Sequence, residues 1–201
     1  MRWIDMKRFS LRCIIAIAAA VVAFSAYQSR GWAATYCSNP PPGGRLLMLV
    51  PRNFENFVYV SDIKGRHTHH NFGEEATDEL QAQLKPFFSS VTIERIQSES
   101  VAKERLAAGD YDQPDNRYDL VAVPEFRDVD SWIKGDHYGF SIDIGVKFYT
   151  PDQSKLTRIQ GSGESDTGFH GFVPGDSGSM ALRKAVEAVA DGVCQEGRKI
   201  L

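Results

Sequence analysis

The stretch GFSIDIGVKFY at residues 139–149 decides the fold, because apolar and polar side chains alternate along its whole length. Alternation with a period of two is typical of a β-strand with one buried and one solvated face. The predicted buried face carries only apolar side chains: Phe140, Ile142, Ile144, Val146 and Phe148. The predicted solvated face carries Ser141, Asp143, Gly145, Lys147 and Tyr149.

Two further segments continue from this strand. The turn sequence TPDQS at 150–154 leads into KLTRIQGSGES at 155–165, so the two strands form a predicted β-hairpin. A looser segment follows and ends in SGSMALRKAVEAV at 177–189. That last sequence has apolar residues at helical spacing, which predicts an amphipathic helix packed on the buried face of the hairpin. Its apolar stripe is Leu182, Ala185, Val186, Val189 and Val193.

Alternating strands and helices precede the hairpin. Apolar runs predict strands at 45–50, 91–96 and 118–123, and helical spacing predicts helices at 74–88 and 99–108. A short apolar run at 57–60 is expected to extend or pair with the first strand. Residues 65–73 are expected to be a loop, and 126–132 a loop or a short extension of the preceding strand. The predicted fold class is therefore α/β (α+β mixed), a single domain of two or three layers. Its mixed sheet should hold about five strands, with a C-terminal β-hairpin and a closing amphipathic helix.

The first 34 residues are predicted to be a secretory signal peptide. A basic segment precedes the uncharged run CIIAIAAAVVAF at 13–24, and small residues near Ala33 offer a cleavage site. A retained signal anchor, with residues 13–28 in the inner membrane, is the alternative. Residues 35–44 are expected to be a Pro/Gly-rich linker, and 45–201 a single α/β domain. The protein is accordingly expected to be periplasmic or secreted.

Two cysteines remain outside the predicted leader. Cys37 and Cys194 lie near the two ends of the mature chain. In an oxidising compartment an isolated pair predicts a disulfide, which could stabilise the fold by roughly 4–5 kcal/mol in the chain-entropy picture. The alternative is two unpaired thiols.

The charge of the mature chain excludes one class of partner. Residues 1–34 hold five of the 23 basic residues and one of the 26 acidic residues, so the remainder carries a formal charge of −7. Nucleic-acid binding needs clustered Lys and Arg, and is not expected. Contact with a membrane is expected only through an uncleaved N-terminal segment.

Several motifs suggest chemistry without establishing it. GDSGS at 175–179 resembles the nucleophile segment of chymotrypsin-like serine proteases, but it leads into a helix, so helix capping by Asp176, Ser177 or Ser179 is the preferred interpretation. A hydrolase centred on Ser177, or on the acidic segment after residue 124, remains an alternative. No catalytic residue is assigned.

Histidines and aromatic residues give two further candidates. His67, His69 and His70 could bind a metal ion, although an exposed polar loop is the simpler interpretation and no cofactor is expected. A periplasmic small-molecule or metal binder that uses this segment is the second functional hypothesis. Aromatic residues in the segment before the last helix suggest a contact surface: Phe169, His170 and Phe172.

The order of these elements resembles the small α/β domain of bacterial envelope-assembly proteins. The resemblance rests on the strand at 45–50, the strand at 118–121, the sequence GSGE at 161–164 and the helix at 180–193. That group includes the N-terminal domain of TolB, the curli secretion lipoprotein CsgG and the penicillin-binding-protein activator LpoB. The resemblance implies an exported, non-enzymatic module that binds another envelope protein, and this is the leading functional hypothesis.

Overall fold

A mixed sheet forms the centre of the domain in the computed structural model, which describes residues 42–63, 65–113, 117–153, 156–168 and 174–200. The strand order is β4-β1-β5-β6-β7, and the short β8 pairs with β6 beyond the end of β7. The strands are β1 (Arg45–Pro51), β4 (Ser90–Ile96), β5 (Leu120–Lys134), β6 (His137–Tyr149), β7 (Leu156–Glu164) and β8 (Thr167–Gly168). β1 is parallel to β4 and β5, whereas β5, β6, β7 and β8 are antiparallel to their neighbours. The mixed α/β fold expected from the sequence is confirmed.

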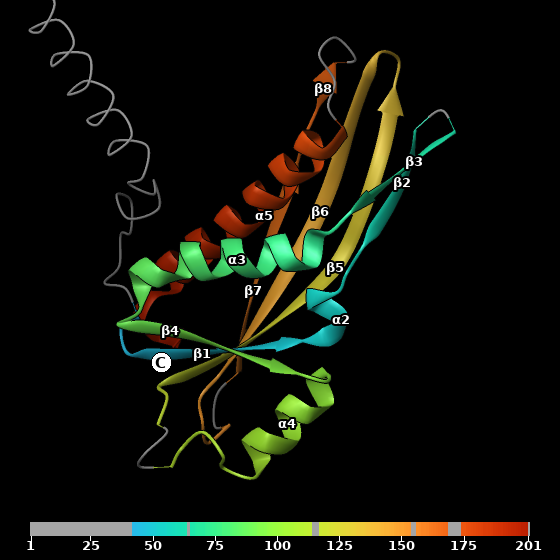
Figure 1. The fold of residues 1–201 in the computed structure, drawn as a ribbon. Helices are drawn as coiled ribbons and strands as arrows, with labels where there is room; N and C mark the ends of the chain where they lie inside the picture. The colour runs from blue at the N-terminus through green and yellow to red at the C-terminus, as the bar shows by residue number, and fades with distance from the viewer. Residues whose placement is uncertain (1–41, 64, 114–116, 154–155, 169–173, 201) are drawn as a thin grey trace, which may run out of the picture. The chain divides into compact units, whose positions relative to one another are not determined.

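Helices cover one face of this sheet along most of its length. α3 (Phe72–Leu84) and α5 (Pro174–Glu196) lie side by side on that face, as Figure 1 shows. The apolar stripe predicted for the last helix is buried completely, and so are the apolar residues of β6. The short elements η2 (Lys85–Phe87), α2 (Arg52–Glu55) and η3 (Gly197–Ile200) complete this part of the chain.

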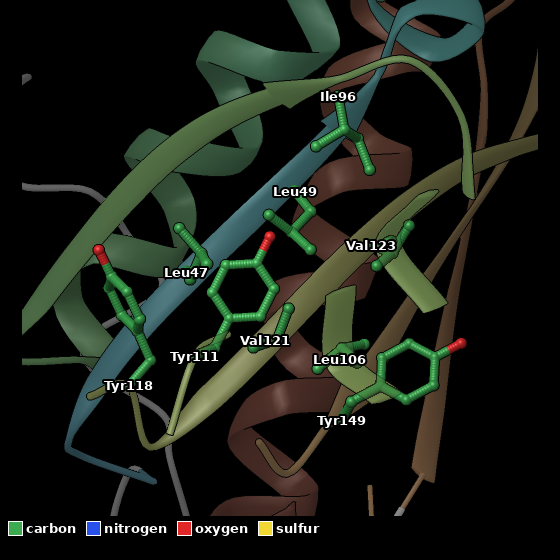
Figure 2. Packing of buried hydrophobic residues seen from close by; sticks show 10 residues of the cluster. Leu47, Leu49, Ile96, Leu106, Tyr111, Tyr118, Val121, Val123 and Tyr149 are labelled. Atoms are coloured by element: carbon green, nitrogen blue, oxygen red, sulfur yellow. The ribbon is translucent and has the colours of Figure 1, made fainter. Parts of the chain in front are cut away.

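Within the described residues, α4 (Glu99–Ala107) covers the opposite face, and only at one end. Ala102 and Leu106 of this helix join a second apolar cluster with residues from β1, β5 and β6 (Figure 2). The expectation of one fully solvated face on β6 is therefore wrong at this end, where Lys147 and Tyr149 are buried. The cause is a helix that the alternation within β6 alone does not reveal.

The predicted loop at 65–73 contains a strand, and the segment at 126–132, predicted as a loop or an extension, is a continuation of a strand. The histidine segment forms β3 (Arg66–His70), which pairs with β2 (Tyr59–Ile63) in a separate two-stranded sheet. The short apolar run therefore pairs with β3, and not with the first strand. The segment 126–132 belongs to β5, which continues through Pro124 to Lys134. Because β1 pairs with β5 only as far as Ala122, Pro124 lies where β5 has lost that neighbour and a missing N–H is tolerated.

The helix termini differ in detail from the expected ones. α3 ends at Leu84, and Pro86 falls in the following 3-10 turn, as a proline should near a helix end. Gly109 has φ +74° just after α4, which is the expected C-terminal geometry. α5 begins at Pro174, so Ser177 and Ser179 lie inside its first turns and do not cap it. The expected leader and most of the expected linker lie outside the described residues.

Candidate binding face and edge strand

One side of β5, β6 and β7 faces away from α5, and α4 covers one end of it. Within the described residues no helix or strand covers the rest of this side. Its register is set by two continuous antiparallel ladders. Adjacent positions across the three strands form rows: Asp130, Ser141 and Glu164; Asp128, Asp143 and Ser162; Glu125, Gly145 and Gln160. We call these nine residues the open face.

The open face carries an excess of negative charge. Asp128 lies directly opposite Asp143 on the neighbouring strand, and Asp130 and Glu164 flank them. Directly opposed like charges destabilise an antiparallel pair, because their Cβ atoms are only about 5 Å apart. Asp128, Asp130 and Glu164 are exposed and Asp143 is half-buried. These carboxylates make this side of the three strands acidic.

Where α4 begins, the charges on the same side of the sheet are neutralised. Lys147 Nζ donates to both carboxylate oxygens of Glu99, each at 2.9 Å, and to Glu125 Oε2 at 2.7 Å. Burial opposes the charge on Lys147, but the hydrogen bonds to Glu125 and Glu99 outweigh it and raise the pKa of the lysine. The hydrogen bond from Lys147 lowers the pKa of Glu99. These ion pairs link α4 to β5 and β6, and the open face ends at this cluster.

β7 is an edge strand of the main sheet. Within the described residues its only strand partner is β6, with which all nine of its residues pair in register. Arg158, Gln160, Ser162 and Glu164 are exposed on one side, and Ile159, Gly161 and Gly163 are buried on the other. The strand contains neither proline nor a bulge, the devices that often protect such an edge.

Glycines explain how α5 is seated on this edge strand. A Cβ atom at Gly161 would overlap the Ala185 carbonyl oxygen and lie 2.7 Å from Val189 N. One at Gly163 would overlap the Ala181 carbonyl oxygen and lie 2.5 Å from Ala185 N. The absence of a side chain at these two glycines therefore permits a close approach of the two backbones. α5 rests directly on β7 and fixes which side of the strand is buried.

A depression lies at the tip of the β5–β6 hairpin. It has a volume of about 630 Å³, and its lining residues are Trp132, Lys134, His137, Glu164, Ser165, Asp166, Met180 and Lys184. His137 Nδ1 lies 2.6 Å from Asp166 Oδ1, and this hydrogen bond raises the pKa of the histidine. The Lys134 ammonium lies 4.9 Å from the centre of the Trp132 ring. The depression is open to solvent, and His137 and Asp166 form a charge pair within it.

The histidines singled out in the sequence do not converge. Alternation along β3 places His67 and His69 on one side of the strand, where they are exposed, and turns His70 into the interior. His70 Nε2 lies 2.9 Å from Ser61 Oγ, and the ring stacks on Phe72 with 5.2 Å between centroids. Burial lowers the pKa of His70. Among the described residues no group of three or more His, Cys, Asp or Glu side chains could hold a metal ion.

Ser177 lies in a buried hydroxyl cluster. Its Oγ is 2.8 Å from Ser165 Oγ and 3.3 Å from Thr167 Oγ1, and the residue is 1% exposed. Ser179 Oγ donates to Glu75 Oε2 at 3.0 Å and so links α5 to α3. These serines join the start of α5 to its neighbours, a role that the resemblance to a protease segment did not suggest.

Other expected features lie outside the described residues. The expected aromatic contact surface, Phe169, His170 and Phe172, lies outside the described residues. Cys37 also lies outside them, whereas Cys194 is buried in α5. The Cys37–Cys194 disulfide therefore stays a prediction. In the described part of the chain no helix has both the length and the apolar character to cross a bilayer.

Comparison with known proteins reveals fold similarity alone. Neither a protein-family model nor a curated protein matches the sequence. A hypothetical protein from Chlamydia trachomatis matches with a TM-score of 0.43 and 11% identity over 75% of this chain and 93% of that chain. The PelC dodecamer from Paraburkholderia phytofirmans matches with a TM-score of 0.41 and 9% identity over 77% of this chain and 93% of that chain. A lipoprotein from Neisseria meningitidis matches with a TM-score of 0.40 and 12% identity over 74% of this chain and 97% of that chain. Such values assign neither a family nor a function to this chain.

Proposed function

We propose that this protein is an exported, non-enzymatic module of the bacterial cell envelope that binds another envelope protein through its open face. The observation that carries the proposal is the directly opposed pair Asp128 and Asp143 on an uncovered three-stranded surface. Directly opposed like charges are unfavourable in an antiparallel pair, and a cationic ligand would relieve the repulsion. The predicted leader and the resemblance to the TolB, CsgG and LpoB group support the envelope location.

The chemistry of the open face defines the partner. Four carboxylates, those of Asp128, Asp130, Asp143 and Glu164, project from neighbouring positions on a rigid sheet. A partner segment rich in Lys and Arg would complement them, and the polar side chains of Ser141 and Ser162 could form hydrogen bonds between the charges. Charge complementarity of this kind chiefly raises the association rate, so binding should weaken with added salt.

Photocrosslinking in living cells tests the proposal. A photoreactive residue is placed at Ser141 or Ser162 on the open face, and at Arg183 on the exposed side of α5 as a control. We expect both open-face positions, but not Arg183, to capture a specific envelope protein. If the three positions yield the same products, the open face is not a binding surface.

A charge variant separates binding from folding. Asp143→Asn removes the opposed charge, so thermal stability should stay the same or rise while crosslinking from Ser162 decreases. A loss of stability with unchanged crosslinking would mean that Asp143 serves the fold and not a partner.

A further inference from the structure

The outer edge of β7 adjoins the open face, which includes Gln160, Ser162 and Glu164, and the sequence of this strand is self-complementary. Suppose that two copies of β7 run antiparallel with a two-fold axis through Gly161. Arg158 then lies opposite Glu164 of the second copy, and Gln160 lies opposite Ser162 of the second copy. By symmetry each of these pairs occurs twice. We propose that β7 pairs in this register with β7 of a second copy, which joins two sheets into one.

The charge pairs favour this register on the exposed side of the strand. Arg158 and Glu164 are both exposed at the two ends of β7. In the described structure Arg158 has only a distant carboxylate neighbour, Glu125 Oε1 at 3.9 Å. Opposite charges placed directly across an antiparallel ladder are stabilising. A shift of the register by two residues removes both pairs, so the charges select one alignment.

The buried side of the strand agrees with the same axis. There Gly161 meets Gly161 of the second copy, and Ile159 lies opposite Gly163 of the second copy. Side chains near the axis are therefore absent, and the two bulky residues are placed away from it.

The helix layer supplies a second, independent match. Lys184, Ala188 and Asp191 share a stripe of α5 by their spacing of four and three residues. Lys184 Nζ donates to the Glu164 carbonyl oxygen at 2.8 Å, which places this stripe along the β7 edge. The residues of α5 above Gly161 are Ala185 and Val189, so the small Ala188 lies close to the level of the axis. Lys184 of one copy then faces Asp191 of the other, in both directions.

Charge exchange tests the proposed register in the full-length protein. Sedimentation equilibrium of the wild type should show a monomer–dimer equilibrium. Arg158→Glu should raise the dimer dissociation constant by at least about tenfold, because two attractive pairs become repulsive. Glu164→Arg should have a similar effect, and the double variant Arg158→Glu/Glu164→Arg should restore dissociation to within about threefold of the wild type. Circular dichroism of each variant establishes that the fold is retained.

Cysteine pairing checks the register directly. In the proposed alignment Gln160 faces Ser162 of the second copy, so mixing Gln160→Cys with Ser162→Cys chains should give an oxidised dimer. Either variant alone should give little, because its own cysteines lie on a diagonal about 7–8 Å apart, too far for a disulfide. A wild type that stays monomeric up to about 100 µM, or a double variant that is not restored, overturns the inference. Ser141 lies on β6 and outside this edge, so crosslinking from Ser141 tells the failure of one proposal from the failure of the other.

Discussion

The contact between α5 and β7 gives the sharpest quantitative prediction. Gly163→Ala adds one methyl group that would overlap the Ala181 carbonyl oxygen and lie 2.5 Å from Ala185 N. Both are backbone atoms of α5, so no side-chain rotation can relieve the overlap. Ordinary contact distances are about 3.4 Å or more, so the helix must rise by about 1 Å from the strand.

The expected cost follows from this displacement. Overpacking of a well-packed site costs about 1–3 kcal/mol, and the upper end applies because the obstructing atoms belong to the backbone. Replacing a strand glycine recovers about 0.5–1 kcal/mol through the lower entropy of the unfolded chain. The net loss should be about 2 kcal/mol, or about 4–8 °C in melting temperature for a chain of this size.

Thermal and urea unfolding followed by circular dichroism measure this loss, and two variants serve as controls. Gly168→Ala makes the same chemical change where no atom lies within 4 Å, and Ser162→Ala alters the exposed side of the same strand. Both should remain within about 0.5 kcal/mol of the wild type. If Gly163→Ala is as stable as these controls, α5 does not rest on β7 as described and the reasoning fails.

Four further predictions concern the interior. Burial lowers the pKa of His70 in the folded state, so the stability of the fold should be complete above the unfolded-state pKa of about 6.5 and should decrease as the pH falls below it. A His70→Phe variant should lose this pH dependence. The same change of melting temperature between about pH 7 and 5 in the variant and the wild type would contradict this. Lys147→Met should lower the free energy of unfolding by about 2–3 kcal/mol in urea, since the partly exposed carboxylates of Glu99 and Glu125 lose their shared cation. A decrease of less than about 0.5 kcal/mol would show that water takes the place of the lysine ammonium. Tyr111→Phe should leave stability unchanged or raise it by about 1 kcal/mol in urea unfolding, because the buried hydroxyl has no hydrogen-bond partner within the described residues. Burial raises the pKa of Tyr111 to about 12, so the variant should lose a tyrosine ionisation near that pH from the absorbance titration of the wild type. If Cys37 and Cys194 form the predicted disulfide, alkylation before reduction should block neither thiol, and reduction should lower stability by up to roughly 4–5 kcal/mol.

The sequence predicts the elements that have a strong periodic pattern. β6 and α5 carry uninterrupted periods of two and about 3.6, and the structure confirms both. The same patterns cannot show which other elements cover a face. Lys147 and Tyr149 occupy positions typical of a solvated face, yet α4 buries them, and α4 lies about 40 residues earlier in the chain.

Two polar strands, β3 and the second half of β5, were hard to predict for one physical reason. Most side chains of β3 and of residues 127–134 in β5 are charged or polar, so the hydropathy of these segments indicates a loop. In both strands much of one side is exposed, and there polar residues cost the strand little. The cross-strand pair Asp128–Asp143 could not be found from sequence either, because it depends on the register at the irregularity between Phe126 and Asp128. The open face was therefore visible only in the structure.

The glycines of β7 connect the stability of the domain to its proposed edge pairing. A slip of β7 by one residue against β6 would turn Gln160 and Ser162 toward α5, where even a Cβ atom does not fit at the neighbouring positions. The helix therefore locks the register of an edge strand, which would otherwise be free to slide. A locked edge presents its N–H and C=O groups, and the charges of Arg158 and Glu164, at fixed positions. Fixed positions are what a second strand needs for pairing in a single register, so Gly163→Ala should weaken the dimer as well as the fold. Ser162→Ala, which leaves the helix contact intact, should affect neither.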